Sequence, residues 1–213
     1  MNLVRDYIMK TLLTLSLILW SYTISQEATL TPTKINEPAD FRISLKYLLS
    51  HEGYYSYHKD DKGGETYCGI TRRFQPNWIG WNILDQYKTE HEIKWNGRIE
   101  ELDHWVLDFY LDLWVKERFY LLKDQHTADY VFDFRINSTV GALIVRRALN
   151  DVGTYIPIVN TMDSSTIASI NKVNKSLFLS KLRRRRISFY NAIVARDASQ
   201  AKFLNHWMQR SNN

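Results

Sequence analysis

The chain has few of the residues that stabilise a fold through covalent or metal links. It contains one cysteine, Cys68, among its 213 residues, so an intramolecular disulfide framework is excluded even for an exported protein. Histidines and aspartates occur near residue 58, but no H-E-x-x-H or C-x-x-C spacing is present, so we expect no metal and no cofactor. We expect Cys68 to be a small buried hydrophobe rather than a nucleophile.

Long apolar runs are also lacking. The most apolar segment, Thr11 to Ile24, is shorter than the roughly 20 apolar residues that span a bilayer. Arg5 and Lys10 precede it, in the order of a secretory signal. We therefore expect residues 1–27 to be a signal peptide that directs export to the periplasm or the extracellular space. No A-x-A cleavage site follows, so an uncleaved membrane anchor and a buried core helix remain open.

Composition limits the rest of the chain to one principal unit. With 45% hydrophobic and 24% charged residues, it can bury one sizeable core, and we expect a monomer. The net charge of +5 favours a polyanionic partner, and three kinds fit: nucleic acid, anionic lipid and an acidic wall polymer. Charge alone does not choose between these three.

The hydrophobic pattern predicts a mainly α-helical domain with at most a small β-hairpin. Residues 28–40 are polar with two prolines and read as a linker that ends at Asp40, a helix N-cap. An apolar stripe then leads from Phe41 to Glu52, with Gly53 as the C-terminal cap. Further helices are predicted within 99–119, on both sides of a break near residues 137–138, at 175–195 and near 201–210.

The stretch "HEGYYSYHKDDKGGETYCGIT", residues 51–71, carries the chemistry. Glu52 lies beside the negative pole of a helix dipole and shares a face with leucines, and both effects favour the protonated acid. A glycosidase needs such a group to protonate the leaving oxygen. A solvated helix end is the structural alternative for this residue.

A glycosidase also needs a second polar group across the scissile bond. Asp60, Asp61 and Thr66 follow Glu52, and the glycines at 63 and 64 allow a turn that returns Thr66 toward it. A polar surface turn is the alternative for these residues. Sugar rings stack on flat aromatic faces, which are offered here by Tyr54, Tyr55 and Tyr57. We expect Glu52 to face a groove that contains Tyr55 and Thr66.

The same stretch resembles the E-G-G-Y…D-P-G-G-x-T-x-x-G-I-T signature of glycoside hydrolase family 108, the lysozyme-like N-acetylmuramidases also known as secretion-activating proteins. Glu52 matches the family's catalytic glutamate, and Gly69 matches one of its glycines. Downstream, "FDFRINS", "RRRRISFY" and "KFLNHWMQR" are similar to later family motifs. Their matching residues are Asp133, Phe134, Asn137, Ser138, Arg186, Phe189, Tyr190, Phe203, Trp207 and Arg210.

This resemblance implies a lysozyme-like helical domain, with a catalytic region at 41–122. It also implies that residues 123–213 form a helical part similar to a peptidoglycan-binding module and packed into the same unit, although the module's D-G-x-x-G-x-x-T turn is absent. We expect Tyr54, Tyr55, Tyr67 and Asn137 to bind substrate, and capping a helix is the alternative for Asn137. Two family glycines are replaced here, by Tyr54 and His206.

Two functional hypotheses follow. The first is a peptidoglycan hydrolase that cleaves the β-1,4 bond between N-acetylmuramic acid and N-acetylglucosamine, with Glu52 as general acid and Asp60 or Asp61 with Thr66 as the assisting groups. The second is an inactive wall-binding or secretion-assisting protein with the same fold. The run of arginines at 183–186 points around a helix, so we expect one of them to touch packed structure. The rest favour anionic wall polymers or lipid over nucleic acid, because no nucleic-acid recognition motif is present.

Overall fold

The computed structural model describes residues 38–57, 64–91 and 97–212. All of them lie in one compact unit, Ile35–Asn213. The predicted signal segment, most of the linker, and Asp60 and Asp61 lie outside the described residues. Within the three described stretches, none of the helices has both the length and the apolar character that crossing a membrane requires.

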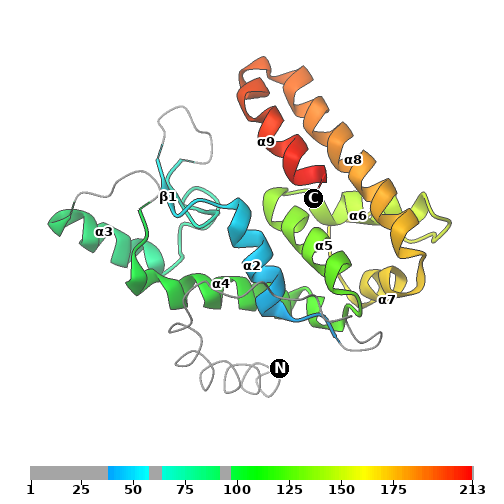
Figure 1. The fold of residues 1–213 in the computed structure, drawn as a ribbon, viewed down its shortest axis with the longest axis horizontal. Helices are drawn as coiled ribbons and strands as arrows, with labels where there is room; N and C mark the ends of the chain where they lie inside the picture. The colour runs from blue at the N-terminus through cyan, green and yellow to red at the C-terminus, as the bar shows by residue number, and fades with distance from the viewer. Residues whose placement is uncertain (1–37, 58–63, 92–96, 213) are drawn as a thin grey trace, which may run out of the picture. The chain divides into compact units, whose positions relative to one another are not determined.

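The described residues form a mainly α-helical fold with one small antiparallel sheet, as Figure 1 shows. The predicted fold class is confirmed. The helices are α2 (Phe41–His51), α3 (Gly80–Glu90), α4 (Asp103–Lys116), α5 (Gln125–Asn137), α6 (Gly141–Asn150), α7 (Ser164–Lys172), α8 (Lys175–Arg196) and α9 (Ala201–Asn212). The sheet has the order β1 (Tyr55–Ser56), β2 (Thr66–Tyr67) and β3 (Ile70–Thr71). Short 3-10 turns are η1 (Glu100–Leu102), η2 (Phe119–Leu121) and η3 (Ala198–Gln200).

Polar side chains define where several helices begin. The Asp40 carboxylate accepts a hydrogen bond from the Arg42 backbone N–H at 2.8 Å, which confirms the predicted N-cap of α2. Asp124, Asp163 and Asn174 cap α5, α7 and α8 in the same manner. Such a cap satisfies a first-turn N–H that has no partner inside the helix.

Helix α5 is the centre of the core. Its residues from Thr127 to Phe134 are all buried, because α2, α6 and α8 pack around it. A helix that is covered on every side lacks a strong amphipathic stripe. Next to it, the rings of Trp114, Phe119 and Phe132 have centroids 5.1 to 5.4 Å apart. This aromatic cluster joins α4 and η2 to α5.

The predicted helix break near residues 137–138 is confirmed. Asn137 ends α5, and its side-chain amide donates a hydrogen bond to the Asp133 carbonyl oxygen at 2.8 Å. Ser138 is the C-cap, and its hydroxyl accepts a hydrogen bond from the Val140 N–H at 3.2 Å. Asn137 therefore closes the end of α5 rather than opening α6.

Candidate active site

Glu52 lies where the sequence predicts it, at the end of α2. It is the C-cap residue, and its N–H donates a hydrogen bond to the Leu49 carbonyl oxygen at 3.3 Å. Its side chain is 17% exposed. The carboxylate is therefore mostly covered by protein while remaining in reach of solvent. Glu52 thus does not lie on an open convex surface, a position that would argue against an active site.

The turn between β2 and β3 covers one side of Glu52. Cys68 and Gly69 both have positive φ angles, 49° and 80°, as the two central residues of a tight hairpin turn require. A Cβ atom at Gly69 would lie 2.9 Å from Glu52 Cδ and 2.9 Å from the Tyr110 hydroxyl oxygen. Tyr110 donates a hydrogen bond to the Cys68 carbonyl oxygen at 2.6 Å. The turn is thus held against the carboxylate, and Gly69 allows the close approach.

Cys68 itself has no catalytic character. It is buried and carries a free thiol. Burial, together with the nearby charge of Asp103, raises the pKa of this thiol to about 12. A thiol with such a pKa remains protonated at neutral pH, so the predicted role as a small buried hydrophobe is confirmed.

Arg210, from α9, reaches Glu52 on another side. Its Nη2 atom lies 2.8 Å from Glu52 Oε1, and its Nε and Nη2 atoms donate to Asp133 Oδ1 at 2.9 and 2.6 Å. Burial would lower the pKa of Arg210, but the charges of Glu52 and Asp133 raise it well above its ordinary value. The sequence predicted that Glu52 shares a helical face with leucines. The structure adds a charged neighbour, because the Arg210 guanidinium contacts the carboxylate.

Asp133 joins this pair to α8. Its Oδ2 atom lies 2.8 Å from Arg186 Nη2, and both side chains are fully buried. The Arg186 guanidinium also lies over the rings of Tyr130, Phe134 and Tyr190, at 5.0 to 5.8 Å from their centroids. The prediction that one arginine of the 183–186 run touches packed structure is confirmed. We call Glu52, Asp133, Arg186 and Arg210 the charge cluster.

The sheet separates residues that the sequence predicted in one groove. Tyr55 pairs with Tyr67 across β1 and β2, whereas Thr66 pairs with Ser56. Neighbouring residues of a strand point to opposite faces, so Tyr55 and Thr66 lie on opposite faces of this sheet. The predicted groove with both side chains is therefore wrong.

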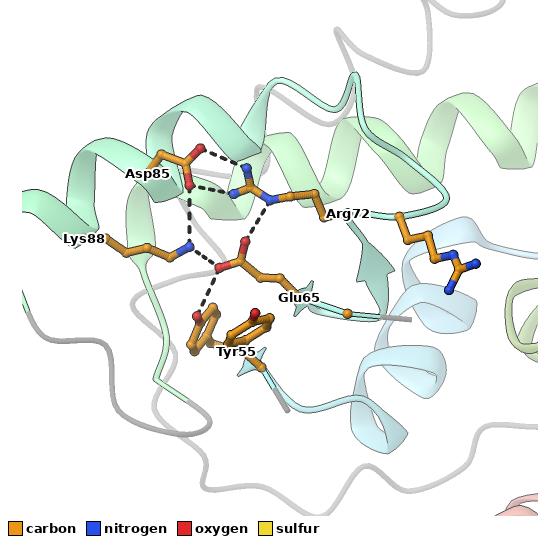
Figure 2. Close-up of a pocket in the computed structure, with 8 residues that line it drawn as sticks. Tyr55, Glu65, Arg72, Asp85 and Lys88 are labelled. Atoms are coloured by element: carbon orange, nitrogen blue, oxygen red, sulfur yellow. Dashed lines mark hydrogen bonds and ion pairs between the residues drawn. The ribbon is translucent and has the colours of Figure 1, made fainter. Parts of the chain in front are cut away.

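Tyr55 instead lines a pocket of about 670 Å³ beside α3, shown in Figure 2. Its hydroxyl donates to Glu65 Oε1 at 3.0 Å, and burial, with this bond, raises the pKa of Tyr55 to about 12. Glu65 also pairs with Lys88 and with Arg72, and Arg72 pairs with Asp85 at 2.6 Å. The two carboxylates of this pocket and two of its cations, Arg72 and Lys88, neutralise one another, which indicates a structural network that fixes the sheet to α3.

The other predicted residues lie in different surroundings. Tyr54 is 39% exposed, which leaves part of its ring accessible. Tyr67 is fully buried, and its hydroxyl both donates to the Ile99 carbonyl oxygen and accepts from the Ile99 N–H. This position corrects the predicted sugar-facing role of Tyr67, because the ring is part of the core. Among the described residues, no group of three or more His, Cys, Asp and Glu is placed to hold a metal ion.

Sequence reasoning did not assign a role to Tyr110, Asp133 or Arg210. Asp133 and Arg210 appeared only as matches to family motifs. The order of these motifs along the chain was the sequence feature that could have pointed to their roles. Tyr110 appeared as one more residue of an amphipathic helix. Their roles depend on contacts between segments that are distant in the sequence. Arg210 and Asp133, for example, are 77 residues apart.

Residues 45–139 match the model of the family Glycosyl hydrolase 108. The resemblance to this family that the sequence indicates is therefore confirmed over this region. A solved structure, that of Brucella abortus SagA, is similar with a TM-score of 0.59 and 18% sequence identity, covering 81% of this chain and 89% of that chain. This likeness shows the fold. No curated protein matches the chain by sequence.

Gly69→Ala is expected to lower stability more than Gly153→Ala. Both glycines have positive φ angles, but only Gly69 has atoms within 4 Å of the added Cβ. The left-handed backbone costs each variant about 1–2 kcal/mol, and crowding against Glu52 and Tyr110 adds about 1–3 kcal/mol at Gly69. Thermal unfolding measures both losses. Equal losses would show that the turn does not press on Glu52.

Asp133→Asn is expected to lower the free energy of unfolding by about 3–5 kcal/mol, because it leaves two buried guanidinium groups without their shared carboxylate. Asp151→Asn serves as the control, since Asp151 pairs with Arg185 at the surface with 30% of its side chain exposed. That change should cost about 1 kcal/mol or less. Urea unfolding followed by tryptophan fluorescence compares the two, and similar costs would contradict a stabilising role of the charge cluster.

Proposed function

We propose that this protein is a peptidoglycan hydrolase that cleaves the β-1,4 bond between N-acetylmuramic acid and N-acetylglucosamine, with Glu52 as the general acid. The observation that carries the proposal is the position of Glu52 in a glycosyl hydrolase 108 domain. Its carboxylate is held between the Gly69 turn and Arg210 and is still partly exposed. A fixed, partly desolvated carboxyl group is what proton donation to a leaving oxygen requires.

Arg210 has a defined part in this proposal. When Glu52 gives its proton to the glycosidic oxygen, a carboxylate remains, and the contact at 2.8 Å stabilises that charge. The same contact orients the carboxyl group before the reaction. Arg210 is therefore a positioning residue that acts through Glu52.

The second polar group stays a proposal from the sequence. Asp60 and Asp61 lie outside the described residues, and Thr66 is a half-buried residue of β2 whose hydroxyl donates to the Gly64 carbonyl oxygen at 3.4 Å. In this proposal one aspartate, with Thr66, stabilises the oxocarbenium-like centre or orients water. Tyr54 offers the exposed ring on which a sugar can stack.

A second function is favoured by one specific observation. The Glu52 carboxylate is paired with a guanidinium. Such a pair suits an inactive protein, because only an enzyme that uses Glu52 as an acid needs it in the protonated form. The alternative is an inactive wall-binding or secretion-assisting protein. In either case we propose export through residues 1–27, peptidoglycan as the partner, and a monomer. The similarity of residues 123–213 to a peptidoglycan-binding module also stays a prediction.

Glu52→Gln is expected to lower the release of reducing ends from purified peptidoglycan by about 10²–10⁴-fold, because it keeps the shape of the side chain and removes the proton donor. Glu90→Gln is the matched control, since Glu90 is an exposed glutamate at the end of α3. It should retain the parent activity. Thermal unfolding of all three proteins checks that each is folded.

Mass analysis of the released fragments identifies the bond that is cleaved. Fragments with N-acetylmuramic acid at the reducing end support the proposed muramidase, whereas N-acetylglucosamine at that end would contradict the bond assignment. If neither the parent nor the variant cleaves and both sediment with peptidoglycan, the wall-binding alternative is correct. Full activity in Glu52→Gln would exclude Glu52 as the general acid.

A further inference from the structure

The four successive arginines of α8, residues 183–186, have different surroundings. Arg186 is buried in the charge cluster, and Arg183 Nη2 donates to the Asn212 carbonyl oxygen of α9 at 3.0 Å. Arg185 pairs with Asp151, and Arg184 is exposed. Successive helical residues are about 100° apart around the axis. Arg184 therefore points away from Arg186 and from the charge cluster.

Arg184 and Arg185 line a groove of about 560 Å³ between α6 and α8. The two helices pack against each other, as Figure 1 shows. Helix α6 and its C-cap contribute Arg147 and Asp151, and α8 contributes Lys181 from the turn before Arg184. Ile144 and Phe189 supply apolar surface to the same groove. We call this the α6–α8 groove.

The positive charge of this groove exceeds its negative charge. Its carboxylate, Asp151, is engaged by Arg185 through two hydrogen bonds of 2.5 and 2.6 Å. These bonds and the charges of Arg185, Lys181 and Arg184 lower the pKa of Asp151, so it stays ionised. Arg147, Lys181 and Arg184 form no ion pair with any residue in the described stretches. Three positive charges around a recess are thus left without a neutralising carboxylate.

The shape and chemistry of the groove select among anions. A flat lipid surface does not enter a recess between two helices, whereas a flexible chain does. A single nucleic-acid strand needs aromatic faces on which its bases stack. The aromatic ring of this groove, Phe189, is half-buried and packs against Phe134 and Tyr190, with centroids 6.2 and 5.4 Å away. The groove therefore offers little surface for base stacking. Arginine matches the oxygen geometry of phosphate groups well.

We propose that the α6–α8 groove binds the phosphate groups of a linear polyanion with a non-aromatic backbone, such as a polyol-phosphate chain. Arg147, Lys181 and Arg184 neutralise the phosphates, and Ile144 and Phe189 contact the backbone between them. The site is separate from Glu52, because Arg184 and Arg186 lie on opposite sides of α8. It is independent of the proposed hydrolase function.

The test compares two triple variants of the full chain that remove equal charge. The groove triple is Arg147→Gln, Lys181→Gln and Arg184→Gln. The control triple is Lys46→Gln, Lys116→Gln and Lys123→Gln, which changes exposed lysines outside the groove. Binding of fluorescently labelled inorganic polyphosphate is measured by anisotropy at several salt concentrations. A thymidine oligonucleotide of equal charge and phosphatidylglycerol vesicles are measured in parallel, and thermal unfolding checks the fold.

The groove triple is expected to weaken polyphosphate binding at least tenfold and to reduce the slope of log affinity against log salt by about two, since each lost phosphate contact removes released counterions. The control triple should change affinity by less than about threefold, as nonspecific charge does. Equal losses in both triples would overturn the proposal. It would also be overturned if the groove triple weakened binding to the oligonucleotide or the vesicles while polyphosphate binding was unchanged.

Discussion

The buried ion contacts of Asp133 are the constraint on which the rest of this fold depends. Asp133 and Arg186 have no exposed side-chain surface, and an unpaired charge at such a depth would cost several kcal/mol. Each charge is therefore paired. With Glu52 and Arg210 included, the charge cluster contains two acidic and two basic side chains. The end of α2 and helices α5, α8 and α9 must all be in place for this balance.

This balance links the part of the chain that matches the family model to the part that lies beyond the match. The family match covers residues 45–139 and contains Glu52 and Asp133, whereas Arg186 and Arg210 come from the helices beyond it. Without α8 and α9, Asp133 would lie at the core with no cation and Glu52 would lose its contact. The C-terminal helices thus complete the surroundings of the candidate acid, whatever else residues 123–213 bind.

The sequence predicted those features that depend on neighbouring residues. The N-cap at Asp40, the end of α2 at Glu52 and the break after Asn137 follow from local hydrogen bonds and periodicity. Helical geometry also required that one arginine of the 183–186 run face inward. It did not identify Arg186, because that choice depends on Asp133, 53 residues away.

The errors at the site have the same origin. Tyr55 and Thr66 look able to share a groove in the sequence, yet the register of a sheet with two-residue strands places them on opposite faces. A slip by one residue would exchange the two faces. Tyr67 is in the core because Ile99, from a segment outside the sheet, satisfies its hydroxyl group. No local pattern contains that partner.

The division of Arg210 between two carboxylates reconciles a paired Glu52 with its proposed role as general acid. Arg210 directs two nitrogen atoms at Asp133 Oδ1, and Glu52 receives a contact from one of them, through Oε1. The two hydrogen bonds to Asp133 hold the guanidinium in place from α5. Glu52 lies against this fixed guanidinium at the end of α2, next to the Gly69 turn. The contact through Oε1 fixes the direction of Glu52, and the proposed role as general acid requires proton exchange through the other oxygen, Oε2.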